Sequence, residues 1–238
     1  MLDLRARLAG VRERIARAAG RVGRDPASIL LVAVSKTFPA DYVRAAAAAG
    51  QTDFGENKVQ EALQKRGDTS DLPLTWHLVG HLQSNKAKKA GASFDVIHSI
   101  DEAGLLGKLE EGARSAQRQV RLLVQVDLAG EATKHGVAAG AVMPILEAAR
   151  ACSAAQVRGL MLLPPAVADP EAARPYFRAL RQLRDDLVAK GVETSMLAEL
   201  SMGMSQDFEV AVEEGATIVR LGSAIFGDRP KRWDKSVV

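Results

Sequence analysis

The sequence has few of the features that mark extracellular or nucleic-acid-binding proteins. Its 238 residues include one cysteine, Cys152, so no disulfide can form within the chain. A single thiol is typical of proteins from reducing compartments, and we expect a cytoplasmic location. Aromatic residues make up only 4% of the chain, and the abundance of alanine favours closely packed helices. The net charge of +3 is too small to predict nucleic-acid binding.

Long hydrophobic runs are also absent. No uninterrupted apolar run approaches the roughly 20 residues that a membrane helix needs. The opening stretch MLDLRARLAGVRERIARAAG is charged throughout and lacks the apolar region of a signal peptide. Hydrophobic residues still account for 47% of the chain, which is typical of a globular protein. The length lies within the roughly 200 to 250 residues of one α/β barrel, so we expect a single domain over residues 1–238.

The first segment has an apolar residue every three or four positions. These residues are Leu4, Leu8, Val11 and Ile15. Their spacing predicts an amphipathic helix. The arginines between them are Arg5, Arg7, Arg12, Arg14 and Arg17. They could form an RNA-binding face, but a solvated helix face is the interpretation that we favour.

Short apolar segments then alternate with helical patterns along the rest of the chain. The predicted strands are residues 29–36, 52–57, 74–80, 95–101, 120–128, 157–163, 194–202 and 216–222. The predicted helices between them are residues 40–49, 58–66, 85–90, 102–118, 141–151, 171–190 and 206–214. Such alternation predicts βαβ units and a parallel sheet. Eight units in one domain favour a (β/α)8 TIM barrel with an extra N-terminal helix. A doubly wound α/β fold is the alternative, but no glycine-rich fingerprint follows the first strand.

In such barrels the site lies at the carboxyl ends of the strands. The first predicted strand ends in Val34-Ser35-Lys36-Thr37. Because side chains alternate along a strand, Lys36 shares a face with Val32 and Val34. If that face is the barrel interior, desolvation favours the neutral amine that Schiff-base chemistry needs. Lys36 is therefore a candidate Schiff-base lysine, although a surface lysine after a strand is the better explanation of this position taken alone.

The last two strands offer a candidate anion site. Arg220 interrupts the apolar run of the eighth strand, and a buried guanidinium needs a carboxylate or a ligand as its partner. Turns of small residues follow the seventh and eighth strands, SMGMS over 201–205 and GSAIFG over 222–227. Loops at these two places commonly hold phosphate in barrels. We therefore predict that an anionic ligand binds here.

The four histidines do not predict a metal site. His77 and His81 are four residues apart, but they lie at the end of a strand with a glycine between them, and zinc would need a third ligand. We expect His98 to pack inside the fourth strand and His135 to lie in a loop after the fifth. We therefore expect no metal ligands. No Ser–His–Asp grouping is apparent, so we expect no catalytic triad.

Six segments, in order along nearly the whole chain, resemble one known family. They are VAVSKT (32–37), FGENKVQE (54–61), WHLVGHLQSNK (76–86), RGLM (158–161), LSMGMS (200–205) and RLGSAIFG (220–227). They are similar to the pyridoxal phosphate homeostasis proteins, which resemble a stand-alone N-terminal barrel of alanine racemase. The tail 228–238 shows no such similarity.

The resemblance implies a function and a set of binding residues. Pyridoxal 5′-phosphate (PLP) would be held as a Schiff base on Lys36, with Arg220 facing the pyridine nitrogen. The remaining residues implied are Ser201, Gly222 and Ser223 for the phosphate, with Asn57 and His77 lining the pocket. The resemblance also implies a role in cofactor homeostasis, as a PLP carrier or buffer, with PLP-dependent apo-enzymes as partners.

Whether such a protein would be an enzyme depends on its acids and bases. An arginine against the pyridine nitrogen disfavours protonation there and weakens carbanion chemistry. Racemases of this type add a tyrosine base from a second domain, whereas Tyr42 and Tyr176 fall in predicted helices. We therefore expect a non-catalytic PLP-binding monomer that binds neither nucleic acid nor membrane. The alternatives are a weak racemase or other PLP enzyme, and a Schiff-base aldolase, which would need an acid beside the lysine.

Overall fold

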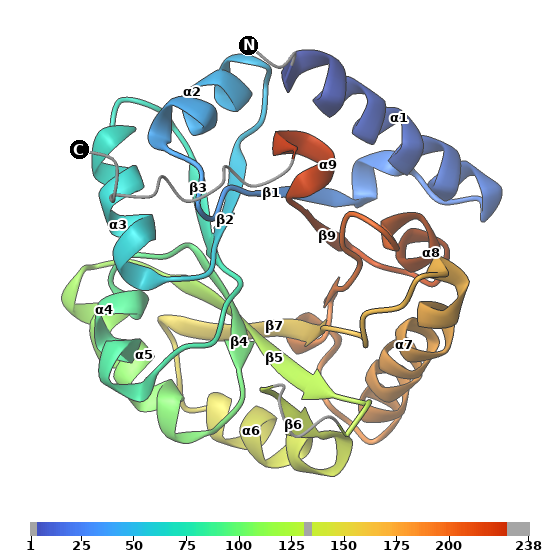
Figure 1. The fold of residues 1–238 in the computed structure, drawn as a ribbon. Coiled ribbons are helices and arrows are strands. Elements are labelled where there is room, and N and C mark those ends of the chain that lie inside the picture. Colours follow the sequence, from blue (N-terminus) through green and yellow to red (C-terminus); the bar gives the residue numbers. More distant parts are fainter. Residues whose placement is uncertain (1–3, 131–134, 228–238) are drawn as a thin grey trace, which may run out of the picture.

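The strands of the computed structural model, which describes residues 4–130 and 135–227, form a closed parallel barrel. Each strand pairs in parallel with its neighbours, and the β4–β5 pairing completes the ring. The strands are β1 Leu30–Val34, β2 Asp53–Glu56, β3 Thr75–Leu78, β4 Val96–Ile100, β5 Val120–Asp127, β6 Val137–Ala138, β7 Ala155–Leu162, β8 Glu199–Ser201 and β9 Ile218–Leu221. Figure 1 looks along the barrel axis and shows the helices as an outer ring. The predicted (β/α)8 barrel is confirmed.

Helices follow the strands as the apolar periodicity predicts. They are α1 Leu4–Arg21, α2 Ala40–Ala48, α3 Val59–Asp68, α4 Ala87–Gly91, α5 Gly104–Ser115, α6 Val142–Ala149, α7 Arg174–Ala189, α8 Phe208–Glu213 and α9 Ser223–Phe226. Short 3-10 turns are η1 Pro26–Ser28, η2 Ser84–Lys86, η3 Ala139–Ala141, η4 Pro170–Ala173 and η5 Thr194–Met196.

Two details differ from the sequence-based prediction. The seventh predicted strand, 194–202, begins with the turn η5, and only Glu199–Ser201 forms β8. The two-residue strand β6 was not predicted, because an isolated pair carries no alternation; it extends the sheet beside the end of β5. Neither difference changes the barrel.

Strand alternation divides the apolar residues between an outer and an inner core. Outward residues such as Leu31 and Ala33 join the large core beneath the helices. Inward residues Val32, Leu123, Met161 and Ile218 form a small cluster inside the barrel. Buried polar side chains, including His77, His98, Ser201 and Arg220, also lie in the interior.

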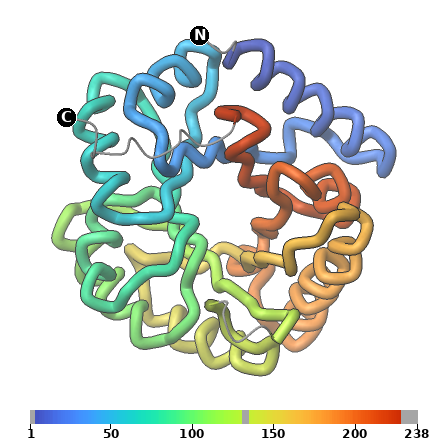
Figure 2. Tube along the Cα trace, in the orientation of Figure 1, coloured from blue at the N-terminus to red at the C-terminus, as the bar shows by residue number. Residues whose placement is uncertain are grey.

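The predicted N-terminal helix is confirmed as α1, which lies beside α8 and α9 (Figure 2). Its apolar stripe from Leu4 to Ile15 is buried. Arg14 pairs with Glu209 and Arg21 pairs with Glu213, so part of its basic face is bound by this chain's own carboxylates. Within the described residues, no helix is both long and apolar enough to span a membrane.

Candidate functional site

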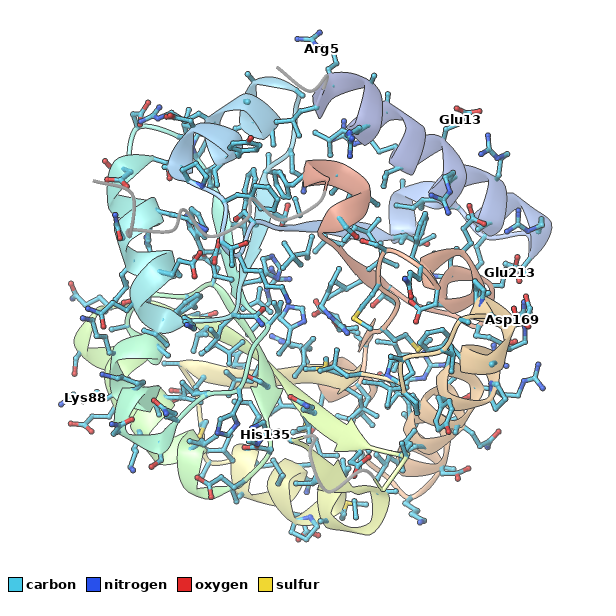
Figure 3. All side chains as sticks on the ribbon, viewed as in Figure 1. Arg5, Glu13, Lys88, His135, Asp169 and Glu213 are labelled. Carbon is cyan, nitrogen blue, oxygen red and sulfur yellow. The ribbon has the colours of Figure 1, made fainter. Side chains whose placement is uncertain are left out.

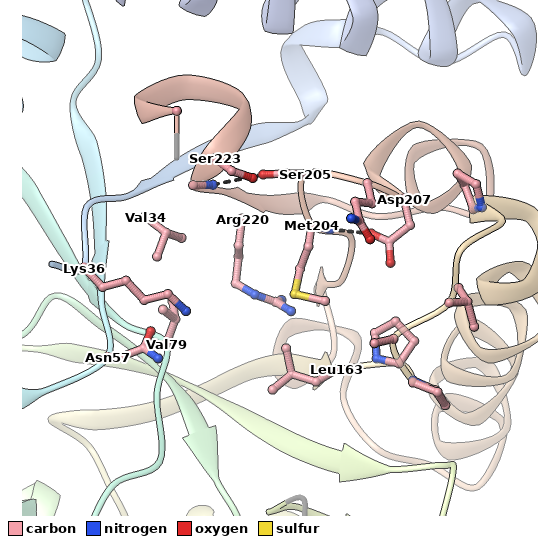
Figure 4. Close-up of a pocket in the computed structure, with 18 of the residues that line it drawn as sticks. Val34, Lys36, Asn57, Val79, Leu163, Met204, Ser205, Asp207, Arg220 and Ser223 are labelled. Carbon is pink, nitrogen blue, oxygen red and sulfur yellow. Dashed lines mark hydrogen bonds between the residues drawn. The ribbon is translucent and has the colours of Figure 1, made fainter. Parts of the chain in front are cut away.

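A pocket of about 600 Å³ opens at the carboxyl ends of the strands, where barrel sites are expected. Two of its sides carry the charged groups that matter here (Figure 4). The Lys36 wall consists of Val34, Lys36, Asn57 and Val79, which lie at or just after the ends of β1, β2 and β3. The Arg220 wall consists of Met204, Ser205, Gln206, Asp207, Arg220, Gly222 and Ser223. Figure 4 shows the side chain of Lys36 pointing across the pocket toward Arg220.

Both neighbours of Lys36 are bound by charged side chains. On one side, the Ser35 hydroxyl donates to Glu56 Oε1 over 2.6 Å. The backbone carbonyl of Ser35 accepts from Lys65 Nζ over 2.8 Å. On the other side, the Thr37 amide donates to Glu61 over 2.7 Å. Thr37 has a φ of 71°, a left-handed conformation that is costly for a β-branched residue. These contacts hold the turn that carries Lys36.

The Glu56–Lys65–Glu61 triad therefore forms a support behind this wall. Lys65 Nζ lies 2.7 Å from Glu56 and 2.9 Å from Glu61. Burial raises the pKa of Glu56, and hydrogen bonds from Lys65 and Ser35 oppose this shift. Glu56 is fully buried, and its second oxygen, Oε2, has no hydrogen-bond partner among the described residues. Removal of Lys65 would leave two carboxylates without their shared cation.

Arg220 is held in a different way. Its guanidinium is buried and donates to the Ser201 hydroxyl and, over 2.9 Å, to the Leu162 carbonyl. Both acceptors are neutral, and no carboxylate of the described chain lies within ion-pair distance of Arg220. Burial lowers the pKa of Arg220 to about 10, and the charge of Asp207 opposes this shift. The pocket therefore contains a buried cation with no carboxylate in direct contact among residues 4–130 and 135–227.

A chain of hydrogen bonds continues from Arg220 through the barrel interior. Ser201 Oγ lies 2.8 Å from His98 Nδ1, and His98 Nε2 lies 2.9 Å from His77 Nδ1. His77 Nε2 lies 3.1 Å from Asp53 Oδ1. Burial lowers the pKa of His98 well below 6.5, so its ring is neutral and must donate at one nitrogen and accept at the other.

One assignment of protons satisfies every member of this chain. Because Ser201 accepts from Arg220, its own proton is donated to His98 Nδ1. His98 then donates to His77, and His77 donates to the carboxylate of Asp53. We assign these tautomers from the hydrogen-bond pattern. The result is a polar interior in which Ser201, His98 and His77 link the guanidinium of Arg220 to the carboxylate of Asp53.

The turns after β8 and β9 meet beside Arg220. Gly203 has a φ of 95°, and a Cβ there would lie 2.6 Å from that of Ala211, so this sharp turn requires glycine. It brings Ser205 next to the start of α9, where its hydroxyl accepts from the amides of Gly222 and Ala224, both over 3.2 Å. Because both lone pairs are used, the hydroxyl proton of Ser205 is left to donate to a ligand.

The structure places five of the seven predicted site residues in this pocket: Lys36, Asn57, Arg220, Gly222 and Ser223. His77 and Ser201 are fully buried in the barrel interior and are not lining residues. Their positions along the strands explain this placement. Val79, which directly follows β3 and lies two residues beyond His77, lines the pocket. Ser201 is the last residue of β8, before the turn at Gly203.

Ser205 and Asp207 are among the lining residues that sequence reasoning did not identify. Ser205 belongs to the small-residue turn SMGMS, which was predicted only as a whole. Its position two residues after Gly203, which makes the turn, is the signal that could have identified it. Burial raises the pKa of Asp207, whose carboxylate accepts from the Met204 amide over 2.6 Å. No pattern in the sequence marked this aspartate.

Comparison with known proteins agrees with this geometry. Residues 7–230 match the family described as alanine racemase, N-terminal domain. The pyridoxal phosphate homeostasis protein of Pseudomonas aeruginosa is 43% identical, over 96% of this chain and 97% of its own length. The protein of the same name from Aquifex aeolicus is 42% identical, over 94% of this chain and 97% of its own length.

Solved structures give the same result. PipY of Synechococcus elongatus, solved with PLP bound, superposes with a TM-score of 0.83 and 39% identity, over 94% of this chain and all of its own. Alanine racemase of Clostridium difficile has a TM-score of 0.71 at 16% identity over 58% of its chain, which shows a shared fold only. Taken together with the barrel and its pocket, these similarities establish that the chain belongs to the pyridoxal phosphate homeostasis proteins, within the alanine racemase N-terminal domain family.

Proposed function

We propose that this chain binds PLP in the barrel-mouth pocket and acts in cofactor homeostasis, as a carrier or buffer. The observation that carries the proposal is the pair Lys36 and Arg220, an amine and a buried cation that face each other across one cavity. PipY, a relative with 39% identity, was solved with PLP bound, which supports the same ligand here.

The donor set of the pocket fits this cofactor. PLP has an aldehyde, a ring nitrogen that can accept a hydrogen bond, and a phosphate dianion. Lys36 supplies an amine that can bond the aldehyde carbon as a Schiff base, with loss of water. The guanidinium of Arg220 supplies a donor for the ring nitrogen. Among the described residues no carboxylate contacts this guanidinium, so a bound ligand can accept from it. Asn57 lies beside Lys36 (Figure 4).

The phosphate would bind at the turns beside Arg220. We propose Ser205, Gly222 and Ser223 as its contacts, with Ser205 in place of Ser201. The hydroxyl of Ser205 has a proton left to donate, while the hydroxyl of Ser201 is used by His98 and Arg220. His77 would act only indirectly, through the interior chain that positions Arg220.

We further propose that the protein is not an enzyme. The bound cofactor would supply an electron sink, but the charge of Arg220 disfavours protonation of the ring nitrogen and weakens that sink. The two tyrosines lie on α2 and α7, and neither lines the pocket. A weak racemase remains the alternative because Asp207, whose pKa burial raises, is a candidate proton donor. A Schiff-base aldolase would need an acid beside Lys36, and Asp207 lies on the opposite wall (Figure 4).

Two experiments test this proposal. Incubation of the PLP-loaded chain with a panel of amino acids should give racemisation slower than about 1 per second, the low end of ordinary enzymes. A faster rate would identify an enzyme instead. Loaded chain should also restore activity to PLP-dependent apo-enzymes while a scavenger removes free PLP. Recovery no faster than spontaneous release would support a buffer and argue against delivery.

The proposed setting is the cytoplasm, which the single cysteine supports, and the proposed state is a monomer. Light scattering of the loaded chain should give a mass near 25.4 kDa. A mass of twice that value would contradict the monomer.

A further inference from the structure

The chain has four histidines, and the structure separates them into two pairs. His77 and His98 are fully buried in the barrel interior. His81 and His135 are exposed, and although 54 positions separate them in sequence, their rings stack with centroids 3.6 Å apart and planes 8° apart. Figure 3 labels His135. The two exposed histidines therefore meet in space at a second site.

Asp101 completes a group of three potential metal ligands. One ligand atom each from His81, Asp101 and His135 lies within 4.8 Å of the others. His81 follows β3, Asp101 follows β4 and His135 precedes β6, so three separate loops contribute. These residues line a hollow together with Leu82, Ser84, Glu102 and Gly136, and it shares no lining residue with the barrel-mouth pocket.

The distance between His81 and Asp101 suits an ion between them. His81 Nδ1 lies 3.3 Å from Asp101 Oδ2, which is longer than the roughly 2.7–2.9 Å of a charge-assisted hydrogen bond. Zinc binds imidazole nitrogen and carboxylate oxygen at about 2.0–2.2 Å, so two ligands of a tetrahedral ion lie about 3.3 Å apart. This pair already has the spacing of two ligands of one ion.

His135 can reach the same ion with a small movement. Its backbone is held, because Gln125 Nε2 donates to its carbonyl, and Gly136 packs so closely that a Cβ would lie 3.0 Å from the amide of Asp127. Its side chain is exposed, and exposed side chains change rotamer within nanoseconds. Because imidazole lone pairs lie in the ring plane, one ring must turn out of the stack before both nitrogens can bind one ion.

We propose that His81, Asp101 and His135 form a zinc-class metal site at the rim of the barrel. Two imidazoles and one carboxylate suit Zn²⁺ and other late transition metals, whereas Mg²⁺ prefers oxygen ligands alone. Three protein ligands leave a fourth tetrahedral position for water or another ligand. A bound ion would connect the loops that follow β3, β4 and β5. The site stands independently of PLP binding.

The test is a titration of the untagged, full-length chain with ZnCl₂ at pH 7.5, followed by calorimetry. We expect one ion per chain, and Co²⁺ in its place should give the intense visible absorption of a tetrahedral site. In NMR spectra, Zn²⁺ should shift the side-chain signals of His81 and His135 and leave those of His77 and His98 in place. MgCl₂ should give no saturable heat.

Three single variants identify the ligands, and a fourth is the matched control. His81→Gln, His135→Gln and Asp101→Asn should each weaken Zn²⁺ binding by at least about 100-fold, more than loss of an outer-shell partner usually causes. Glu102→Gln removes the same charge as Asp101→Asn from the same hollow and should bind Zn²⁺ like the unaltered chain. The proposal is overturned if no binding saturates below about 1 mM. It is equally overturned if any of these three variants binds Zn²⁺ normally, or if Glu102→Gln loses binding as they do.

Discussion

The two walls of the pocket hold their cations by opposite means. Behind the Lys36 wall, Glu56 and Glu61 surround Lys65 with formal negative charge, and this triad holds the residues on both sides of Lys36. Behind the Arg220 wall, the acceptors of the guanidinium among the described residues are both neutral. The carboxylates behind the first wall pair directly with Lys65, whereas the guanidinium on the second wall shares that wall with Asp207 but has no carboxylate within ion-pair distance among the described residues. An anionic ligand is therefore stabilised more by the second wall than by the first.

Substitutions at the two walls should therefore have different effects on the stability of the fold and on ligand binding. A buried ion pair that loses one partner leaves an uncompensated charge, so damage to the Lys36 wall should destabilise the fold. The Arg220 wall already lacks an ion-pair partner within the described residues, so changes there should mainly affect the ligand. Four predictions test this contrast, in order of decreasing effect.

Loss of Lys65 should have the largest effect on folding. Lys65→Met leaves Glu56 buried without its cation, and we expect the free energy of unfolding to fall by about 3–5 kcal/mol. Urea unfolding monitored by circular dichroism measures it. The matched control is the double variant Glu56→Gln with Lys65→Met, which removes both charges and should recover part of the loss. A single variant as stable as the unaltered chain would show that the triad is not the support of this wall.

Loss of the Ser205 hydroxyl should weaken binding of the phosphate, and it also removes the acceptor of the Gly222 and Ala224 amides. A hydrogen bond to a charged group contributes about 1.5–3 kcal/mol, so Ser205→Ala should raise the Kd for PLP about 10- to 150-fold. The Kd for pyridoxal, which lacks the phosphate, should change little. Absorbance titrations of both ligands provide the comparison. An equal loss of affinity for both would mean that Ser205 does not contact the phosphate.

The neutral chain behind Arg220 should make stability depend on pH. The pKa of folded His98 is lowered well below 6.5 by burial, while the unfolded histidine titrates near 6.5. Below that pH the unfolded chain binds more protons than the folded chain, so stability should fall as pH drops from about 6.5 toward the folded-state pKa.

The expected loss for His98 is about 1.4 kcal/mol for each pH unit in that range. Urea midpoints between pH 7 and pH 5 measure it, and His98→Gln should show a correspondingly smaller slope. Identical slopes in the two proteins would mean that His98 is not held neutral by the fold.

The smallest effect concerns the strained turn of the Lys36 wall. Thr37 adopts a left-handed conformation that costs an ordinary residue roughly 1–2 kcal/mol. Thr37→Gly removes this strain but costs about 0.5–1 kcal/mol in backbone entropy, so we expect a gain in stability below about 1 kcal/mol. Thermal unfolding of the chain without PLP measures the change. A clear loss of stability would show that the threonine side chain has a role of its own.

The sequence predicts the barrel well and the interior of the barrel poorly. Alternation of strands and helices is a local pattern, so it predicts all eight barrel strands and places Lys36 and Arg220 at the correct end. The layers inside the barrel depend on register between strands. His77 and Val79 face the same way along β3, and only the pairing with neighbouring strands shows that Val79 reaches the pocket.

The turn after β8 shows the same limit. Ser201 and Ser205 belong to one short segment, and both are plausible phosphate ligands by residue type. The left-handed turn at Gly203 separates them, with Ser201 in the interior and Ser205 beside Gly222. Likewise, nothing along the chain indicates that His81 and His135 stack, because loops that follow β3 and β5 bring them together.

The central prediction is that Lys36, on the wall backed by the Glu56–Lys65–Glu61 triad, forms the covalent bond to PLP. The most direct test is borohydride reduction of the PLP-loaded chain, followed by proteolysis and mass spectrometry of the peptides. The account predicts one reduced adduct per chain, on the peptide that contains Lys36, and its loss in Lys36→Ala. A reducible adduct that persists at full occupancy in Lys36→Ala, or that maps to another lysine in the unaltered chain, would contradict it.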